Sequence, residues 1–413
     1  MKSYLLIFTS VIVASSLSAQ AQNYDTNNPF VQTFVGSGFY GYLDGQGTQT
    51  MFNNPSAVVA DSSSNLFVLD ISNYRIRKVT PDGTVSTFAG GGGGAVPGYG
   101  TSVSLTPYTF GNYSTMAIDH SNTLWINAIN GSAYLLRIGN DGYVSSSNPG
   151  LSLTGGLAVD SGNNLYISDY GSHRIYRYRT NGTFEVFAGS GNSGFVDGNG
   201  IFTSFYYPTA LTVDQADNVY VFDGQTIRKI NQNQDVITIA GQPLNYSDAD
   251  GVGVGATFSA VSTMCTDNSG NVFLATATSI RRMSMETNVV TVAGSFSQGG
   301  YVNGAGSAAR FSTAHGICVS QGMLFVADEG NQRIRSIAFN PSPQVVTGAN
   351  LAINTYPGVT ISGIIGRTYQ IQTSPDMINW TVQANILLPS SPYLWFDANP
   401  VAGNHFYRAL LLP

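Results

Sequence analysis

The acidic stretch at residues 247–253, Ser-Asp-Ala-Asp-Gly-Val-Gly, has the residue types and spacing of a cation site. Asp248 and Asp250 stand at alternating positions before a glycine, as at the start of a calcium loop. The stretch lacks the later bidentate acid that such loops use. Asp248 and Asp250 are therefore weak candidate calcium ligands, and the favoured interpretation is that their carboxylates cap a turn. No cofactor is predicted, with calcium as the alternative.

The four histidines are the next candidates, for metal ligation or acid–base catalysis. His120 and His173 lie in predicted turns and His405 in the tail, whereas His315 directly precedes a predicted strand. One histidine does not make a ligand set, and the sequence contains no HExxH, GxSxG or P-loop pattern. No catalytic residue is predicted, although carboxylates dispersed along the chain leave enzymatic activity an open question.

The two cysteines, Cys265 and Cys318, are 53 residues apart at the same position of two consecutive repeats. Two cysteines in an exported protein suggest a disulfide. Equivalent positions on neighbouring strands can exceed the ~5.5–6 Å Cα separation that a disulfide prefers. Buried free thiols are the favoured interpretation, and the disulfide is the alternative.

Short strands must position these residues, because one apolar segment recurs six times along the chain. Each copy alternates apolar residues over so short a run that it indicates a strand, and each has an aromatic residue in its third position. We expect this aromatic column to wedge between sheets rather than to stack on a ligand. The six aromatic residues are Phe67, Trp125, Tyr166, Tyr220, Phe273 and Phe325.

Each copy belongs to a unit of four predicted strands. In the first unit these are AVVAD (57–61), NLFVLD (65–70), YRIRKV (74–79) and STFAG (86–90). Four strands at a period near 50 residues are typical of a β-propeller blade, and radial stacking lets each blade bury both faces. The predicted fold is therefore all-β, with a six-bladed propeller over residues 22–340.

The segment NLFVLDISNYRIRKV (65–79) resembles the NHL repeat, as do NLYISDYGSHRIYRY and MLFVADEGNQRIRSI. The second and fifth units lack the aspartate, and the resemblance covers about residues 30–340. It implies a propeller whose partners are proteins. From the residue types themselves, we expect the side chains to satisfy turn amides. The matching residues are Asp70, Asn73, Arg75 and Ile76, then Asp169, His173, Arg174 and Ile175, then Asp328, Asn331, Arg333 and Ile334.

The resemblance also raises a catalytic alternative. Similar folds in extracellular lactonases and lyases hold a metal in the central tunnel with His, Asp, Glu or Asn side chains. An extracellular hydrolase or lyase with a tunnel metal is therefore the alternative to a binding protein, and only His315 is expected near the tunnel mouth.

Glycine-rich loops connect the predicted blades. Four of them place a phenylalanine eight residues after an Asp-Gly or Asn-Gly pair begins, which supplies turn chemistry. We expect these phenylalanines to pin each loop under the next blade. They are Phe52, Phe205, Phe258 and Phe311.

Composition and the N-terminal residues bear on location and partners. The chain has 17 basic residues and a net charge of −6, so a phosphate-tracking surface and a nucleic-acid partner are excluded from the prediction. Residues 1–21 are predicted to be a signal peptide, with Lys2, an apolar run at 4–14 and the small-x-small site at 19–21. We expect an exported protein that is periplasmic, at the cell surface or extracellular, with no transmembrane segment in the mature chain.

The repeat pattern stops after residue 340. Residues 341–350 are predicted to be a linker and residues 351–413 a small C-terminal β-sandwich-like domain of five or six strands. A module of this size has little core of its own, so we expect it to dock on the last blade.

The segment QTFVG (32–36) matches the fourth-strand sequence STFAG, although no other strand precedes it. We predict that residues 31–36 supply the missing fourth strand of the last unit and close the ring; the competing segment is PQVVTG (343–348). Together these features predict a secreted, non-enzymatic binding or scaffold protein with a protein or peptide partner. The low charge and 23 tyrosines leave a glycan partner open.

Overall fold

The structure analysed is a computed structural model, which describes residues 24–110, 114–341, 358–361, 366–374, 378–388, 393–396 and 406–412. It is all-β, with strands and short 3₁₀ turns. The signal peptide predicted at 1–21 and most of the predicted linker, residues 342–350, lie outside the described residues. In the described parts of the chain, no helix is both long and apolar enough to span a membrane.

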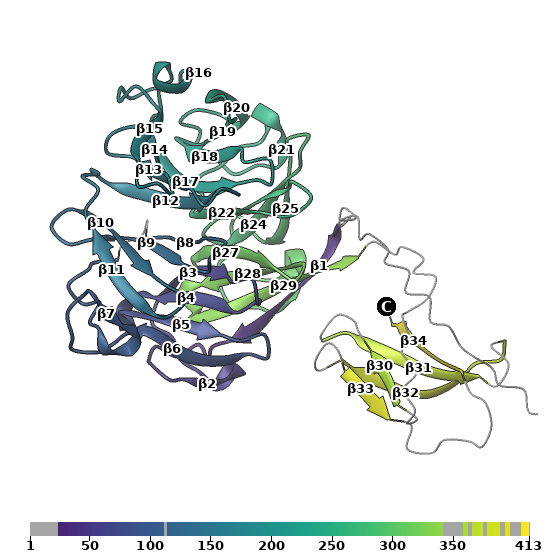
Figure 1. The fold of residues 1–413 in the computed structure, drawn as a ribbon. Helices are drawn as coiled ribbons and strands as arrows, with labels where there is room; N and C mark the ends of the chain where they lie inside the picture. The colour runs from purple at the N-terminus through teal and green to yellow at the C-terminus, as the bar shows by residue number, and fades with distance from the viewer. Residues whose placement is uncertain are drawn as a thin grey trace, which may run out of the picture.

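Six sheets, each with four main antiparallel strands, surround a central axis (Figure 1). The innermost strands lie next to one another in the order β3, β8, β12, β17, β22, β27 and back to β3. This confirms the predicted all-β propeller. The blades consist of β3 (Pro55–Ala60), β4 (Leu66–Asp70), β5 (Arg75–Val79) and β6 (Thr84–Gly90); β8 (Met116–Ile118), β9 (Leu124–Ile129), β10 (Ala133–Ile138) and β11 (Tyr143–Ser147); β12 (Thr154–Val159), β13 (Leu165–Asp169), β14 (Arg174–Tyr178) and β15 (Phe184–Ala188); β17 (Pro208–Val213), β18 (Val219–Asp223), β19 (Thr226–Ile230) and β20 (Asp235–Gly241); β22 (Thr263–Thr266), β23 (Val272–Ala275), β24 (Ser279–Met283) and β25 (Asn288–Gly294); and β27 (Ala314–Ser320), β28 (Met323–Asp328), β29 (Arg333–Pro341) and β1.

The N-terminal strand β1 (Tyr24–Val35) closes the ring as the fourth strand of blade 6. It pairs antiparallel with β29, with Val31 opposite Ile337 and Thr33 opposite Arg335. In Figure 1 the purple β1 lies beside the green β29, although the two are separated by almost the whole propeller sequence. The predicted closure by residues 31–36 is confirmed, and β1 extends further towards the N-terminus than predicted, as far as Tyr24.

A short fifth strand covers the outer edge of every blade except blade 3. Each cover comes from the loop that leads into its own blade, and a 3₁₀ turn follows it. The cover strands are β2 (Gly45–Gln46), β7 (Gly98–Tyr99), β16 (Gly198–Asn199), β21 (Gly251–Val252) and β26 (Gly304–Ala305). The turns after them are η1 (Gly47–Gln49), η3 (Gly100–Ser102), η4 (Gly200–Phe202), η5 (Gly253–Gly255) and η6 (Gly306–Ala308), and two more, η2 (Ile71–Asn73) and η7 (Glu329–Asn331), join second to third strands.

Apolar clusters between neighbouring blades form the core. The aromatic column lies in these clusters, as predicted: five of its members are buried and Trp125 is partly buried. Where a column residue carries a polar atom, it bonds to the aspartate that ends the first strand, as Tyr166 does with Asp160 at 3.2 Å. The column therefore packs the blades together and does not form an open ring of ligand-stacking aromatics.

Polar contacts join neighbouring blades near the start of two innermost strands, β12 and β27. Asn127 of blade 2 donates to the carbonyl of Gly155 in blade 3 at 2.7 Å, and Thr263 of blade 5 donates to the carbonyl of His315 in blade 6 at 2.7 Å. Backbones also come very close at two glycines of these strands, Gly156 and Gly316. A Cβ on Gly156 would lie 2.4 Å from the backbone nitrogen of Leu211, so only glycine fits.

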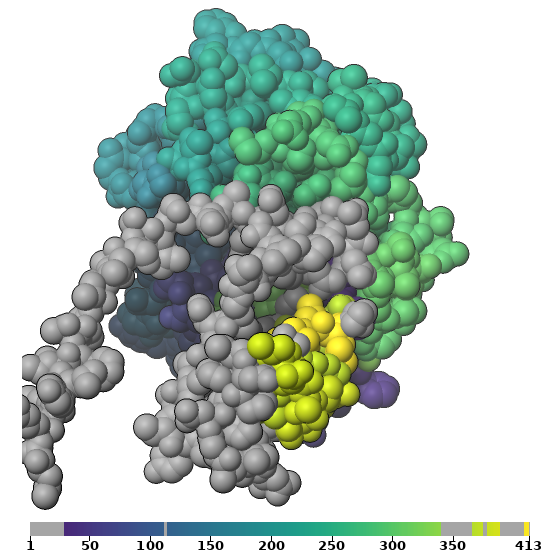
Figure 2. All heavy atoms as spheres, turned by 90° about the vertical axis from the view of Figure 1, so that its right-hand side faces the viewer, coloured from purple at the N-terminus to yellow at the C-terminus, as the bar shows by residue number. Residues whose placement is uncertain are grey.

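The C-terminal residues form a separate module of two small sheets. Its strands are β30 (Gly358–Ile361), β31 (Thr368–Ser374), β32 (Thr381–Leu387), β33 (Tyr393–Phe396) and β34 (Phe406–Leu411). β30 pairs with β33, and β31 lies between β32 and β34. Gly366 lies against the last blade, since a Cβ there would be 3.0 Å from Oε1 of Gln32 in β1. In Figure 2 the yellow C-terminal residues lie below the teal atoms of blades 3 and 4.

Candidate functional site

A buried arginine anchors the loop that leads into blade 1. Arg77 lies in the third strand, and its guanidinium donates to the carbonyl of Leu43 at 3.0 Å and to the carbonyl of Met51 at 3.0 Å. The same group donates to Asp44 at 2.6 Å and to the fully buried Asp70 at 2.9 Å. Phe52 packs against it, with the guanidinium carbon 5.1 Å from the ring centroid. One side chain thus holds both ends of the loop that carries cover strand β2.

The same arrangement recurs in blades 4, 5 and 6, and we call each instance an arginine hub. In every hub the guanidinium donates to two loop carbonyls and to the loop Asp or Asn, and a buried phenylalanine lies against it. The hub arginines are Arg77, Arg228, Arg281 and Arg335; their loop acids or amide are Asp44, Asp197, Asp250 and Asn303; their phenylalanines are Phe52, Phe205, Phe258 and Phe311. The prediction that these phenylalanines pin the loops is confirmed.

Burial controls the electrostatics of the hubs. Burial raises the pKa of Asp223 to about 6, against the lowering effect of the Tyr207 N–H and Arg228. Burial likewise raises the pKa of Asp70 and Asp328, which also pair with hub arginines. In blade 5 Thr276 stands where the other three hubs have this aspartate, and burial lowers the pKa of Arg281, opposed by Asp250.

The loops held by the hubs expose large aromatic residues. Two of these rings also pack against an arginine of the third strand. Arg75 stacks on the Tyr42 ring at 4.0 Å and Arg333 on the Tyr301 ring at 3.9 Å. The hubs therefore keep the loop backbones in place while apolar rings face solvent, an arrangement suited to binding. The exposed aromatic residues on the four hub loops are Phe39, Tyr40, Tyr42, Phe202, Tyr246, Phe296 and Tyr301.

A second group of aromatic rings lies where blades 3 and 4 meet. Tyr206 and Tyr207 directly precede the first strand of blade 4 and are both partly exposed. Tyr207 lies 4.6 Å from the ring of Tyr170, and Tyr206 stacks on Phe195 at 5.2 Å. His173 contacts the carbonyl of Tyr206 through Nδ1 at 2.8 Å. This group continues the aromatic residues of the hub loop as far as the start of β17.

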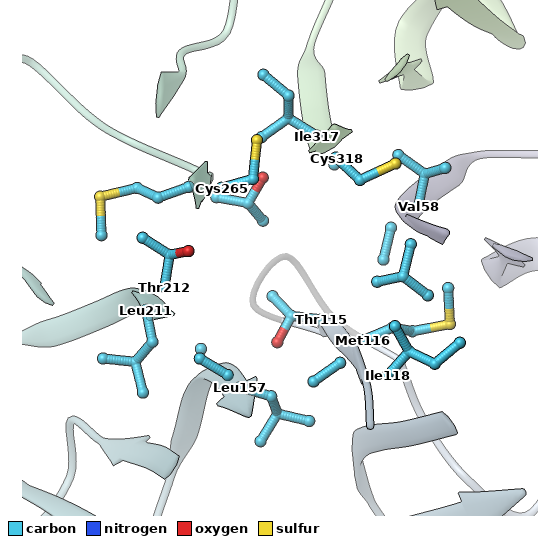
Figure 3. A pocket seen from close by; sticks show the side chains of 18 of the residues that line it. Val58, Thr115, Met116, Ile118, Leu157, Leu211, Thr212, Cys265, Ile317 and Cys318 are labelled. Carbon is cyan, nitrogen blue, oxygen red and sulfur yellow. The ribbon is translucent and has the colours of Figure 1, made fainter. Parts of the chain in front are cut away.

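The central cavity encloses about 350 Å³ and is lined by the first strands of all six blades (Figure 3). Val58, Met116, Leu157, Leu211, Cys265 and Cys318 represent the six strands in the view. Among the lining residues there is no carboxylate and no imidazole. The cavity therefore offers a metal none of the oxygen and nitrogen side chains named for the tunnel-metal alternative.

The structure places the predicted calcium candidates beside a guanidinium. Asp250 accepts from Arg281 at 3.0 Å and from the N–H of Thr291 at 2.7 Å. Asp248 accepts the N–H of Ser259 at 3.0 Å and lies 3.8 Å from Arg281. Both carboxylates thus have partners within the chain, and a calcium site remains a prediction.

Cys265 and Cys318 are free thiols at neighbouring positions of the ring. Cys318 is buried in the cluster between blades 6 and 1, and Cys265 packs against the cluster between blades 5 and 6. Burial raises the pKa of both thiols, and for Cys265 the nearby Cys318 and Asp267 raise it further. Burial therefore favours the protonated, unreactive form of both.

His315 lies at the start of β27, where blade 6 meets blade 1. Its Nδ1 donates to the carbonyl of Ser56 at 3.1 Å and lies 3.7 Å from Glu329. Burial raises the pKa of Glu329, partly offset by His315. His120 and His173 lie in turns, as predicted, and His405 is outside the described residues. Among the residues that the structure describes, no three His, Cys, Asp or Glu side chains gather as a metal would require.

Sequence reasoning missed the hub arginines. It singled out Arg75, Arg174 and Arg333 as repeat residues, whereas in blades 1 and 6 the hub arginine is two positions after Arg75 and Arg333. The Ile-Arg pair occurs in the third strands of blades 1, 4, 5 and 6, the same four blades whose loops carry the Asp-Gly or Asn-Gly pattern. Leu136 and Tyr176 take the arginine position in the other two blades, which have neither pattern. That co-occurrence was the available signal.

Comparison with known proteins identifies the repeat. The sequence profile of the NHL repeat matches residues 155–178, which cover the first three strands of blade 3. Over 324 residues, 74% of this chain, it is 24% identical to the Arabidopsis thaliana protein SUPPRESSOR OF QUENCHING 1, chloroplastic. Over 167 residues, 34% of this chain, it is 29% identical to Teneurin-3 of Danio rerio. The aligned parts amount to 27% and 6% of those two much longer proteins.

A solved structure shares the architecture. The auxiliary nutrient binding protein of Bacteroides thetaiotaomicron VPI-5482 superposes with a TM-score of 0.59 at 18% identity, over 75% of this chain and 76% of that one. At this level of identity the similarity shows a common fold.

Proposed function

The chain is an NHL-repeat β-propeller, and we propose that it is an exported binding protein that presents its inter-blade loops to a protein or peptide partner. One observation carries the proposal: exposed aromatic rings stand on loops whose backbones are held by buried arginines. Phe39, Phe202 and Tyr246 are 71%, 79% and 64% exposed. A loop fixed before binding loses little conformational entropy when a partner docks.

The composition of the hub loops supports a macromolecular partner. The loop at 189–207 reads GSGNSGFVDGNGIFTSFYY, and the loop at 36–52 reads GSGFYGYLDGQGTQTMF. Glycine, serine, tyrosine and phenylalanine dominate. Antibody paratopes likewise combine rigid aromatic rings, which give contact area, with small residues, which give adaptable hydrogen bonds. Lysine and glutamate, which are depleted from interface cores, are absent from both segments.

A glycan or another small nutrient is the second candidate ligand. The Bacteroides protein of this fold is described as an auxiliary nutrient binding protein, which supports a binding role in general. The partly exposed Tyr206 and Tyr207 present ring faces with polar tips, which suit a ligand that is apolar on one side and hydroxylated on the other.

The catalytic alternative needs a metal that the central cavity does not favour. A hydrolase or lyase of the kind considered above would draw its ligands from the tunnel wall, and the wall consists of apolar residues, threonines and two cysteines. Elemental analysis of the purified protein tests this alternative. Stoichiometric calcium or zinc, removed by EDTA together with a fall in Tm, would support the enzyme and contradict our proposal.

Binding itself is tested with two probes, a displayed library of random peptides and a glycan array. The wild-type chain is compared with a variant in which Phe39, Tyr40, Phe202 and Tyr246 are replaced by serine, and with the control Met285→Ser. Met285 is 78% exposed, lies on the turn between the third and fourth strands of blade 5, and belongs to none of the hub loops. We expect peptides that the wild type and M285S enrich and the loop variant does not. Glycan signals lost in the same variant, with no peptide enrichment, would contradict a protein partner.

A further inference from the structure

Blade 3 has an outer strand that is left open, in contrast to the other blades. We propose that the outer edge of β15 (Phe184–Ala188) binds an extended acidic peptide segment by strand addition. This inference rests on the proposed function, because it specifies how a peptide partner would be held. The hub loops and the β15 edge are different surfaces. An experiment can therefore contradict strand addition at β15 without contradicting binding by the hub loops, and the reverse.

The five covered blades show what such an edge accepts. In blade 4 the cover strand β16 pairs antiparallel with β20, with Gly198 opposite Val236 and Asn199 opposite Asp235. The preceding Asp197 accepts the N–H of Thr238 at 2.9 Å. An extended Asp-Gly-x segment therefore fills the edge through main-chain pairing and one charge-assisted hydrogen bond.

The carboxylate contact recurs with the cover strand. In blade 1 Asp44 accepts the N–H of Thr87 at 3.1 Å, and in blade 5 Asp250 accepts the N–H of Thr291 at 2.7 Å. In all three blades the aspartate is also held by the hub arginine, and the N–H that it accepts belongs to a threonine. Blade 3 has Tyr176 at the arginine position, so the edge N–H is the part of this contact that it shares. We therefore take the Asp-Gly segment as the template for the occupant of an open edge.

Blade 3 presents the same backbone positions without a cover. Val186 pairs with Tyr176 of β14 as Thr238 pairs with Arg228 in blade 4, so Val186 is the equivalent edge residue. The segment that leads into blade 3, residues 148–153, is six residues long, whereas the cover strand of blade 4 lies on a loop of about twenty. In the described part of the chain, no strand pairs with the outer side of β15.

The charge at this edge selects an acidic segment. Arg177 and Arg179 both bind Glu185 of β15, at 2.6 and 2.7 Å. Two guanidinium groups against one carboxylate leave a net positive charge, although the whole chain is acidic, with a net charge of −6. The Arg179 side chain is 39% exposed, so it remains accessible to a partner carboxylate.

An aromatic group beside the edge provides an anchor for a side chain of the partner. Phe184 stacks on Tyr176 with ring centroids 5.1 Å apart and lies 6.4 Å from Tyr178. All three rings are half-buried. In strand addition, the main chain gives affinity and pockets for alternate side chains give specificity. The edge in Figure 1 is the outermost strand of blade 3, distant from the C-terminal module in the view.

The probe is a fluorescein-labelled peptide with the sequence of residues 194–203, GFVDGNGIFT, which contains the natural cover of blade 4. Its binding to the full mature chain is followed by fluorescence polarisation. Val186→Pro removes the edge N–H at a position where proline is tolerated in an edge strand. We expect V186P to weaken binding by about tenfold or more at unchanged Tm, and a peptide with Asp replaced by Asn to bind about tenfold more weakly.

Two charge-reversal variants, one at the edge and one away from it, provide the matched control. Arg179→Glu reverses the charge at the edge, whereas Arg137→Glu makes the same change at an exposed position of blade 2. We expect R179E to lose binding and R137E to keep it; this comparison stands even if V186P fails to fold. No binding by the wild type, or equal losses in R179E and R137E, would overturn the proposal. A dimer in light scattering that V186P abolishes would show that a second copy occupies the edge, and would overturn it too.

If peptide binding is absent while the loop variant still loses its library partners, only the strand-addition inference fails. If both are absent, the proposed function fails as well.

Discussion

The carboxylate of Asp328 lies 2.6 Å from the guanidinium of Arg335, and both side chains are fully buried. The same relationship joins Asp70 to Arg77 and Asp223 to Arg228. Each pair connects the second and third strands of a blade and, through the arginine, the loop in front of that blade. The hub loop and the interior of the blade are therefore held by the same ion pair.

Removing the aspartate of such a pair should be strongly destabilising. Asp328→Ala leaves Arg335 buried with its charge uncompensated, and we expect the free energy of unfolding to fall by about 3–5 kcal/mol. Asp82→Ala, at an exposed turn of blade 1, is the control; it loses only surface hydrogen bonds from Thr80 and Thr84, and we expect a fall of about 1 kcal/mol. Chemical denaturation of both variants measures the difference. A loss in D328A no larger than in D82A would contradict the structural role of the hub.

The hub of blade 4 should make stability depend on pH. The pKa of Asp223 is raised by burial to about 6 in the folded chain, from 3.8 when unfolded, so the folded state holds this proton more tightly. The resulting stabilisation is complete below about pH 4 and is lost as the pH rises through 6, a change of about 3 kcal/mol. Asp223→Asn should remove this component. Denaturation at a series of pH values between 3.5 and 7.5 tests it, and an identical slope in D223N would argue against the shift.

The glycines between innermost strands should not tolerate a side chain. In Gly316→Ala the new Cβ would lie 2.7 Å from Cα of Ala57 and from the carbonyl oxygen of Ser56, so blades 6 and 1 must separate. We expect a loss of about 1–3 kcal/mol. Gly255→Ala is the matched control, because its Cβ would meet no atom within 4 Å. Thermal melts of the two variants report the effect, and equal Tm values would refute the close approach.

In the closing strand β1, a buried and a half-buried neighbour should differ in how much an introduced carboxylate lowers the free energy of unfolding. Val31 is buried between blades 5 and 6, whereas the next residue, Gln32, is only half-buried. Val31→Asp places an unpaired carboxylate in the core, and we expect a loss of several kcal/mol, about 3 or more. Gln32→Asp should cost less than about 1 kcal/mol. If denaturant midpoints of the two variants coincide, the observed register of β1 is wrong.

The two cysteines should react only after unfolding. Burial raises the pKa of both Cys265 and Cys318, so neither forms a thiolate near neutral pH in the folded chain. We expect no reaction with a thiol-specific dye at pH 8 in the native protein and two reactive thiols in guanidinium chloride without reductant. Two unreactive cysteines in the denatured protein would reveal a disulfide.

The sequence was sufficient to predict the architecture because each blade is a repeat of the same strand pattern. Six copies of an aromatic strand indicated six sheets, and the match between residues 32–36 and 86–90 located the closing strand before any pairing was known. Local strand patterns and a repeat length determine such a fold almost completely.

The hubs were not predicted because they depend on contacts between residues far apart in the chain. Arg77 joins residues 44, 51 and 70, and in sequence it is one of two arginines in RIRKV. Strand periodicity places Arg75 and Arg77 on the same face of the sheet, so it does not tell which of them is buried. The role of Asp250 could not be decided from the sequence for the same reason. Its spacing fits a calcium loop, and its partner Arg281 lies 31 residues away in the chain.

Closure by β1 has a consequence for the order of events during synthesis. Residues 30–35 are made about three hundred residues before their partners at 334–338. Until then blade 6 is incomplete, and the faces that blades 1 and 5 would pack against it stay uncovered. Contacts of such long sequence separation make folding slow and leave strand edges exposed meanwhile. The complete circle can therefore form only after residues 334–338 have been made, and until then the unclosed chain exposes strand edges that can aggregate.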